Sequence, residues 1–249
     1  MKRTAMWASV AVWAAIVTAA TAIGADPVSI APFSTAQPGP SLPAGWQVLA
    51  VRHEKLPRFE VVREGERSVL RIHADDAVGS AAHVLDADPR ANPMLTWHWK
   101  IDHALEKANL AAKDGDDFAA RVYVSFDVPL AQLSFAARAK LRIARLVYGP
   151  DLPTAAICYV WDNRHPIGTS AWNVYTDRVR IVVLESGNAK AGQWVREARD
   201  VDADFQAAFG AVHKGPTPHV TGVAVSSDTD QTRESVTAWF DDLRLEPRP

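Results

Sequence analysis

The sequence predicts an all-β protein, an antiparallel β-sandwich of jelly-roll type with a helical insertion around residues 130–147. Short apolar runs recur along the chain, turn-forming Gly, Pro, Asp and Asn separate them, and many runs alternate apolar with polar residues at the two-residue period of a strand. Many short strands of this kind indicate a sandwich or a barrel. The strand-like segments are 46–51, 59–62, 68–73, 81–85, 94–101, 118–126, 155–161, 178–184, 194–199, 220–226 and 237–245.

The first 25 residues have the order of a secretory signal peptide. Lys2 and Arg3 precede an apolar stretch over 5–20, and small residues follow at Ala20-Thr21-Ala22. The stretch is short and rich in alanine, and no second long apolar run follows it, so we expect no membrane span after signal cleavage. An uncleaved anchor is the alternative. The expected location is periplasmic or secreted.

Residues 26–45 carry several prolines and little periodicity, which predicts an extended lead-in before a single β-sandwich domain over 46–249. The formal net charge of −2 gives no reason to expect a nucleic-acid partner. Cys158 is the only cysteine, so the fold must be stabilised by its hydrophobic core and not by an intramolecular disulfide. The apolar residues around Cys158 predict a buried, inert thiol.

The main helical candidate lies between Pro129 and Gly149. An apolar stripe that includes Leu133 and Leu141, and a basic stripe that includes Arg138, follow the 3.6-residue period of a helix. The basic stripe suggests either a surface for an anionic polymer or the solvated face of a helix that covers the sheet. A second short helix is expected over 202–209.

Two acidic turns are candidates for a metal site. Asp114, Asp116 and Asp117 precede the clearest strand, 118–126, and Asp228 and Asp230 follow the strand-like run 220–226. A hard cation such as Ca²⁺ needs several oxygen ligands at close range, which these turns supply if the fold brings them together. The spacing is not that of an EF-hand, because its glycine and its closing glutamate are missing. The alternative is that the aspartates only form and solvate turns.

Two strand-like segments present polar faces. In 94–101, His98 and Lys100 lie opposite the apolar face of Trp97 and Trp99. A zinc site formed by His98 and a histidine five residues later is disfavoured, because that spacing places the two on opposite faces of a strand. The alternative to a ligand role for the polar residues is ordinary solvation of a half-buried sheet.

In 118–126, Phe118 and Ala120 are expected to face the core, whereas Arg121 and Tyr123 face the other way. If this strand lies near 94–101, the two polar faces merge into a concave surface. Such a surface suits sugars, which need forked hydrogen-bonding groups for their hydroxyls and an aromatic platform for their C–H faces.

Further polar residues lie at strand ends. Asp162 and Arg180 are additional ligand-binding candidates, and Asp162 with Glu185 is a candidate carboxylate pair for glycoside cleavage. The alternative is that they are ordinary strand ends. The sequence has no Gly-x-Ser-x-Gly elbow, phosphate-binding loop or dinucleotide fingerprint, and Pro57 replaces the second histidine of a zinc-protease motif. Those enzyme classes are disfavoured.

Several short segments carry a family resemblance. They are Gly115-Asp116-Asp117-Phe118-Ala119-Ala120-Arg121-Val122-Tyr123-Val124, Tyr159-Val160-Trp161-Asp162, Thr176-Asp177-Arg178-Val179, Glu185-Ser186-Gly187, Trp194, Arg199-Asp200-Val201, Asp204-Phe205, Phe209-Gly210 and Asp228-Thr229-Asp230. Together they resemble the exported bacterial family called domain of unknown function 3047, over nearly the whole chain from Trp46. The resemblance implies no activity and no catalytic residues. The closing segment 239–245 also resembles the last strand of galactose-binding-like jelly rolls, a fold used by many carbohydrate-binding modules.

These observations predict a non-catalytic binding module for a saccharide or another envelope polymer, with Ca²⁺ ordering the acidic turns. The alternative is an envelope polysaccharide hydrolase or lyase that uses Asp116 or Asp117 with Asp162. A structural envelope protein held by partners is a third hypothesis. The predicted ligand-binding residues are His98, Lys100, Arg121, Tyr123, Arg180 and Asp162, and the predicted metal ligands are Asp114, Asp116, Asp117, Asp228 and Asp230.

Overall fold

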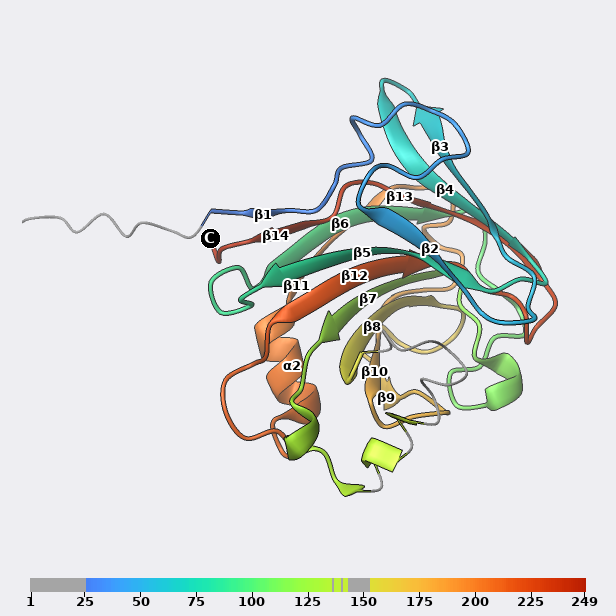
Figure 1. Ribbon diagram of the computed structural model, residues 1–249. Coiled ribbons are helices and arrows are strands. Elements are labelled where there is room, and N and C mark those ends of the chain that lie inside the picture. Colours follow the sequence, from blue (N-terminus) through green and yellow to red (C-terminus); the bar gives the residue numbers. More distant parts are fainter. Residues whose placement is uncertain (1–25, 136, 140, 143–152) are drawn as a thin grey trace, which may run out of the picture.

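The computed structural model describes residues 26–135, 137–139, 141–142 and 153–249, so the predicted signal peptide lies outside the described residues. Within these ranges the chain forms two curved β-sheets of seven strands each, which pack face to face (Figure 1). The all-β, jelly-roll-type sandwich predicted from the sequence is confirmed. Each of the eleven predicted strand segments overlaps an observed strand.

The first sheet, here called sheet A, is antiparallel throughout. Its strand order is β1-β14-β6-β13-β4-β3, and β11 pairs with β6 beside this path. The strands are β1 (Val28–Ser29), β3 (Arg58–Glu64), β4 (Arg67–Asp75), β6 (Met94–Ile101), β11 (Val195–Asp200), β13 (Ser235–Phe240) and β14 (Arg244–Glu246).

The second sheet, sheet B, has the order β2-β5-β12-β7-β8-β10-β9. Its strands β8 and β10 are parallel, whereas the other strand pairs of the described residues are antiparallel, as predicted. Parallel neighbours need a crossover connection, and the chain between β8 and β10 supplies it together with the short edge strand β9. The strands are β2 (Trp46–Ala50), β5 (Gly79–Ala87), β7 (Ala120–Phe126), β8 (Ala155–Asp162), β9 (Ser170–Trp172), β10 (Val179–Ser186) and β12 (Val220–Ser226).

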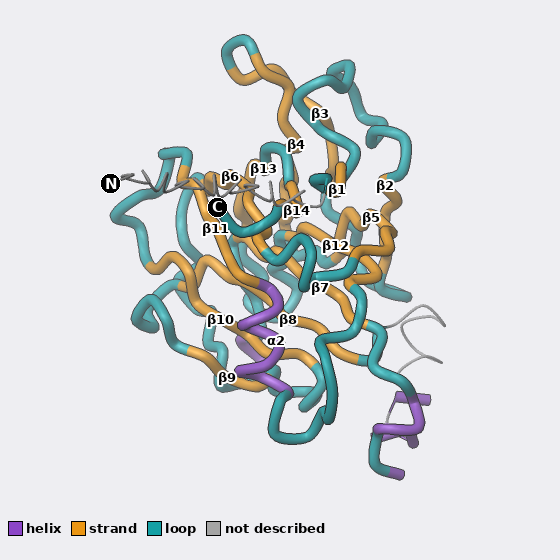
Figure 2. The backbone as a smooth tube through the Cα atoms, turned by 90° about the vertical axis from the view of Figure 1, so that its left-hand side faces the viewer, coloured by secondary structure: helices purple, strands orange, loops and turns teal. Residues whose placement is uncertain are grey.

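The helix predicted over 202–209 is confirmed as α2 (Val201–Phe209), which lies against the strands in Figure 2. Of the predicted insertion at 130–147, the described residues form a short 3₁₀ turn, Leu130–Gln132, and helical backbone at 135, 137–139 and 141–142. The rest of that insertion lies outside the described residues. A second 3₁₀ turn, Lys113–Gly115, precedes β7.

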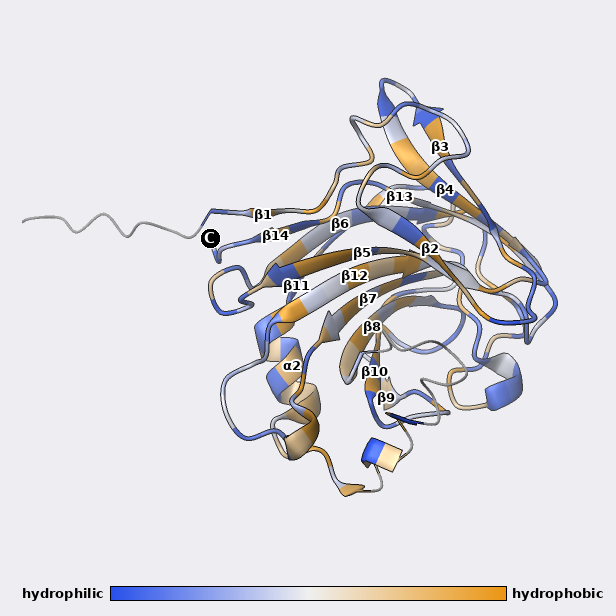
Figure 3. Ribbon diagram, viewed as in Figure 1, coloured by the Kyte–Doolittle hydropathy of each residue, from blue (hydrophilic) through white to orange (hydrophobic). Residues whose placement is uncertain are grey.

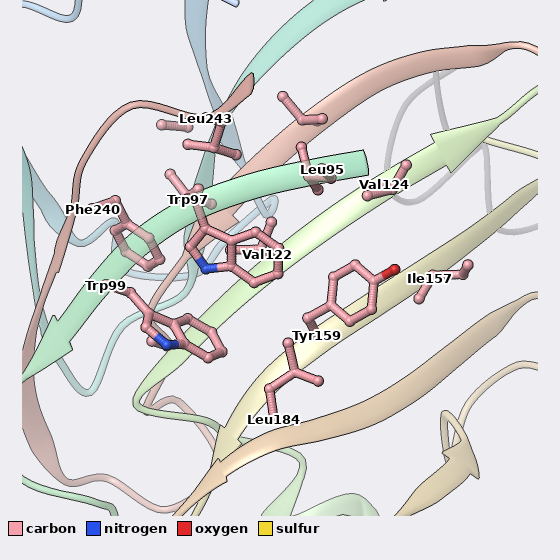
Figure 4. Close-up of a cluster of buried hydrophobic side chains, with 14 of the residues drawn as sticks. Leu95, Trp97, Trp99, Val122, Val124, Ile157, Tyr159, Leu184, Phe240 and Leu243 are labelled. Atoms are coloured by element: carbon pink, nitrogen blue, oxygen red, sulfur yellow. The ribbon is translucent and has the colours of Figure 1, made fainter. Parts of the chain in front are cut away.

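The main core lies between the two sheets. Trp97 and Trp99 of β6 point into this core and meet edge to face, with their ring centres 5.6 Å apart (Figure 4). Trp97 also packs on Tyr159 of β8, with a distance of 5.4 Å between the ring centres. Apolar residues follow the central strands β5, β12 and β7, and hydrophilic residues gather in the connecting loops (Figure 3). Burying each such side chain contributes roughly 1.5–3 kcal/mol, so this layer supplies much of the driving force for folding.

The proline-rich lead-in belongs to the sandwich. Ile30 and Phe33 are buried in the main core. The ring centres of Phe33 and Trp46 are 4.6 Å apart, and Trp46 Nε1 donates a hydrogen bond to the carbonyl oxygen of Ala31. The ordered fold therefore begins before Trp46, because these two apolar residues bury their side chains in spite of their irregular backbone. Among the described residues, no helix is long and apolar enough to cross a membrane.

Candidate functional site

The two acidic turns meet at one end of sheet B. Strands β7 and β12 are antiparallel neighbours, and Arg121 at the start of β7 lies opposite Ser226 at the end of β12. The turn before β7 and the turn after β12 are therefore adjacent. Carboxylate oxygens of Asp117, Asp228 and Asp230 all lie within 4.8 Å of one another. We call these three residues the aspartate cluster.

Arg121 lies beside this cluster and is bound entirely within the protein. Its Nε donates to Asp228 Oδ1 at 2.8 Å, and its Nη2 donates to Asp228 Oδ2 at 2.5 Å. Its Nη1 donates to the Tyr123 hydroxyl at 3.0 Å, and Nη2 also donates to the backbone carbonyl oxygen of Asp116. Only 3% of Arg121 is exposed. The prediction that Arg121 forks onto a saccharide is therefore wrong in this structure.

Arg121 is covered because the chain before β7 folds over the outer face of sheet B. Phe118 lies in that segment, ahead of the first paired residue of β7, and its ring centre is 4.5 Å from the Arg121 guanidinium carbon. Phe118 was expected to face the main core, but it packs instead in a second apolar cluster on this outer face. The other buried members of that cluster are Leu110, Cys158, Val160, Ile181 and Val183.

Cys158 is confirmed as a buried, free cysteine. Burial raises the pKa of its thiol to about 12, so the thiol stays protonated at physiological pH.

The aspartate cluster leaves oxygens without partners. Asp117 is fully buried, and its Oδ2 accepts the amides of Gln231 and Thr232 at 3.1 and 2.6 Å, whereas its Oδ1 accepts none. Burial raises the pKa of Asp228 to about 8 against the lowering effect of Arg121, and burial with the charge of Asp117 raises the pKa of Asp230 to about 6. Ionised carboxylates at this place therefore cost free energy unless a further positive charge balances them.

The remaining predicted metal ligands lie outside this cluster. Asp116 is buried, and its Oδ2 accepts from the Asn173 side chain at 2.9 Å. Asp114 belongs to the 3₁₀ turn and is exposed.

A different surface lies on the outer face of sheet A. The strand register places Glu60, Arg71, Trp239 and Lys100 side by side on β3, β4, β13 and β6. Lys100 Nζ lies 4.4 Å from the ring centre of Trp239 and 5.1 Å from the ring centre of Trp194, which directly precedes β11. Trp194 is 37% exposed and Trp239 is partly exposed. We call this surface the tryptophan face.

Two polar hollows lie on sheet A, and one of them is lined by Trp239. One, of about 150 Å³, is lined by residues that include His98, Arg67 and Arg196, and burial lowers the pKa of His98, which keeps its ring neutral at pH 7. The second, of about 250 Å³, is lined by Trp239 and by four polar residues, Arg58, Arg71, His73 and Thr237. Both offer hydrogen-bonding groups, and the second offers them beside the partly exposed ring of Trp239.

The predicted ligand-binding residues do not form one surface. His98 and Lys100 lie on the outer face of sheet A, whereas Arg121 and Tyr123 lie on the outer face of sheet B. The predicted merging of these two faces is wrong, because strands 94–101 and 118–126 belong to different sheets.

The other two predicted ligand residues also lie on sheet B. Asp162 is 1% exposed, and its Oδ1 accepts two backbone amides of its own turn, from Arg164 and His165. Arg180 is partly exposed near the sheet edge, with its guanidinium carbon 4.9 Å from the ring centre of Trp172. These contacts bind Asp162 within its turn and leave Arg180 apart from the tryptophan face.

Trp194 and Trp239 are not among the binding residues predicted from the sequence. A signal for Trp239 was present, because it alternates with Val236, Ala238 and Phe240, which face the core. That parity puts Trp239 on the outer face. Trp194 precedes its strand, so no alternation indicated its direction.

Comparisons with known proteins give one family and several distant similarities. The sequence profile of the family described as protein of unknown function (DUF3047) matches residues 44–244. No curated protein matches the chain significantly.

Three solved structures illustrate the structural similarities. A Cel12A cellulase derived from Rhodothermus marinus shares 10% identity and a TM-score of 0.42, with 88% of this chain and 98% of that chain covered. A family 12 xyloglucanase from Bacillus licheniformis shares 10% identity and a TM-score of 0.43, with 90% and 100% covered. A family 30 carbohydrate-binding module of a Clostridium thermocellum cellulase shares 12% identity and a TM-score of 0.34, with 90% and 94% covered. At these values the similarities assign no activity to the chain.

Proposed function

This chain belongs to the family described as protein of unknown function (DUF3047), and we propose that it binds a saccharide chain across the outer face of sheet A. The observation that carries the proposal is the tryptophan face, where Trp194 and Trp239 flank Lys100 on one side of an antiparallel sheet. Large indole rings that stay partly exposed provide apolar area for a ligand at little conformational cost.

The chemistry of this face suits a sugar. The C–H faces of a pyranose ring stack on an indole, and its hydroxyls need donors and acceptors beside that ring. The hollow next to Trp239 offers Arg71, His73 and Thr237 for this purpose, and the other hollow offers His98. Two separate hollows on one open face favour an extended chain over a single sugar.

The charges of this face favour a neutral saccharide. Lys100 pairs with Glu64 at 2.7 Å, Arg71 pairs with Glu60, and Arg67 pairs with Asp241 at 2.7 Å. Because carboxylates of the protein already balance these cations, little net positive charge remains to attract an acidic polymer. We therefore expect binding that depends weakly on salt concentration.

The proposed location of the protein outside the cytoplasm depends on its N-terminal sequence. A cleaved signal peptide over 1–25 would deliver the protein to the periplasm or the cell exterior, where envelope polysaccharides are the available saccharide chains.

The test is retention on immobilised neutral polysaccharides and a glycan array. Trp239→Ala and Trp194→Ala should each weaken binding at least tenfold, since buried aromatic anchors at binding interfaces contribute about 2 kcal/mol or more. Trp172→Ala is the matched control, because Trp172 is 38% exposed and also lies beside an arginine, but on sheet B. Absence of retention on every glycan, or loss of binding in the control alone, would contradict the proposal.

Hydrolysis of a polysaccharide is the alternative function. The carboxylates predicted for it, Asp116 or Asp117 with Asp162, are buried and lie at sheet B, so such an enzyme would act away from the tryptophan face. The same samples test it, because an enzyme releases soluble reducing ends during incubation and a binding module does not. Release by wild type that Asp117→Asn abolishes would identify a hydrolase.

A further inference from the structure

We propose that the aspartate cluster binds a calcium ion, with Asp117, Asp228 and Asp230 as ligands. The site lies at the end of sheet B and so is independent of the saccharide-binding proposal, which concerns the outer face of sheet A. A divalent ion here would join two turns about 110 residues apart in the sequence, as the hydrogen bonds between Asp228 and Phe118 already do.

The first argument is charge. Three carboxyl groups with oxygens within 4.8 Å of one another face one guanidinium, that of Arg121, so with all three ionised, as a bound cation requires, two negative charges exceed the positive charge supplied by Arg121. Asp117 and Asp228 are 0% and 6% exposed, so water does not screen them well. A bound divalent cation would neutralise this excess where the fold holds the carboxylates together.

The second argument is independent of charge and concerns hydrogen bonding. In the described part of the chain, nine buried side-chain nitrogen or oxygen atoms have no hydrogen-bond partner. Five of the nine belong to the two acidic turns, although these turns are a small fraction of the chain. They are Asp116 Oδ1, Asp117 Oδ1, Ser227 Oγ, Asp230 Oδ1 and Thr232 Oγ1.

Asp117 shows why these oxygens lack partners. The backbone amides of Gln231 and Thr232 hold its Oδ2, and the side chain is fully buried, so the carboxylate cannot rotate its Oδ1 toward solvent. A buried acceptor without a donor costs about 1–3 kcal/mol. An unpaired buried oxygen on a carboxylate that belongs to a cluster of three carboxylates is a pattern that a cation satisfies.

The type of donor selects the type of ion. The cluster has only oxygen donors and no histidine or thiolate, which disfavours zinc and copper and favours a hard cation. Magnesium demands an octahedron and retains several of its waters, whereas calcium accepts six to eight oxygens in flexible geometry. Three carboxylates from two turns, which supply up to six oxygens, match the calcium preference.

The experiment uses the full-length mature protein, stripped with a chelator and dialysed. Calorimetric titration with CaCl₂ should give saturable binding with Kd below 1 mM. Calcium at 100 times Kd should raise Tm by about 5–10 °C, given the stabilisation expected from mass action at that ratio. MgCl₂ titrated in the same way should bind at least tenfold more weakly. Absence of binding heat up to millimolar CaCl₂, or equal affinity for both ions, would overturn the proposal.

Variants locate the site. Asp117→Asn retains an acceptor for the two amides but loses a charge, and Asp230→Asn changes a partly exposed residue that folding tolerates more readily. Each should weaken calcium binding at least tenfold. Asp114→Asn removes one exposed charge from the same turn and should bind as wild type does. Wild-type affinity in Asp230→Asn, or equal weakening in Asp114→Asn, would refute the assignment even if Asp117→Asn failed to fold.

Discussion

Glu197 of β11 is partly buried. Trp99 Nε1 donates to its Oε1 at 3.2 Å. Burial, and after it the charge of Glu185, raises the pKa of Glu197 to about 7. Glu185 itself is 5% exposed and forms an ion pair with Lys190 at 2.5 Å. At neutral pH the ionisation of Glu197 therefore costs part of the stability of the sandwich.

The replacement Glu197→Gln tests this cost. Because the folded pKa lies above the ordinary value of 4.5, the stability linked to the neutral form is fully present below pH 4.5 and is lost as pH rises through 7. The variant keeps an acceptor for Trp99 and cannot ionise. It should be more stable than wild type at pH 8, and this difference should shrink as the pH falls toward 4 in urea denaturation.

Glu66→Gln, at an exposed position of the β3–β4 hairpin, is the control for that measurement and should leave the pH dependence unchanged. Parallel pH profiles for wild type and Glu197→Gln would contradict the argument.

Single residues also show what the sequence could predict. Period-two alternation correctly gave the strand face of Arg121, but not whether that face is open. The segment that buries Arg121 lies before β7, and its packing against Cys158 and Ile181 depends on contacts between distant parts of the chain. Alternation alone therefore identified polar side chains without separating a ligand site from an internal ion pair.

At the scale of elements, α2 combines a cap with an apolar stripe. Asp200 accepts a hydrogen bond from the Ala203 amide at 2.9 Å, which satisfies one of the free donors at the helix start, and it also pairs with Arg248 at 2.8 Å. Phe205 and Phe209 then bury their rings against the main core, with Phe205 4.7 Å from Phe126. The cap fixes where the helix begins, and the two rings fix its position on the sandwich.

Removal of the cap should therefore cost measurable stability. Asp200→Ala loses the acceptor and is expected to lower the free energy of unfolding by about 1 kcal/mol. Asp200→Asn keeps an acceptor and loses only the exposed ion pair with Arg248, so it should cost a few tenths of a kcal/mol. Urea denaturation monitored by tryptophan fluorescence measures both. Equal losses in the two variants would show that the ion pair, and not the cap, stabilises the helix.

Strand positions were predictable because burial on one face imposes a local pattern, as in β6, where buried and partly exposed residues alternate from end to end. Pairing was not. The edge strand β9 has three residues with no periodic signal, and the parallel pairing of β8 with β10 depends on how their connection crosses the sheet. Local sequence carries strand propensity, whereas neighbour identity comes from tertiary packing.

At the scale of the whole molecule, two candidate sites lie on different sheets. The aspartate cluster is assembled where β7 and β12 are neighbours, and the meeting of its two turns was the condition stated for a metal site. The tryptophan face is assembled by β4, β13 and β6 in sheet A. The polar residues lie on strands or at strand ends, as the sequence indicated, but the merged surface predicted for 94–101 and 118–126 does not form, because local sequence does not assign strands to sheets.

The lead-in contributes buried side chains to the sandwich, and the replacement of one of them tests how much it stabilises the fold. Phe33 is fully buried, contacts Trp46 and lies in a segment held to sheet A by the hydrogen bond from the Ser34 amide to Asp242 at 2.9 Å. Phe33→Ala should lower the free energy of unfolding by about 3–5 kcal/mol, the usual cost of removing a buried ring and leaving a cavity. Phe135→Ala, which removes a ring that is 83% exposed, should cost little. Urea denaturation of both variants decides the matter, because equal stabilities would mean that the fold is complete from Trp46 onward.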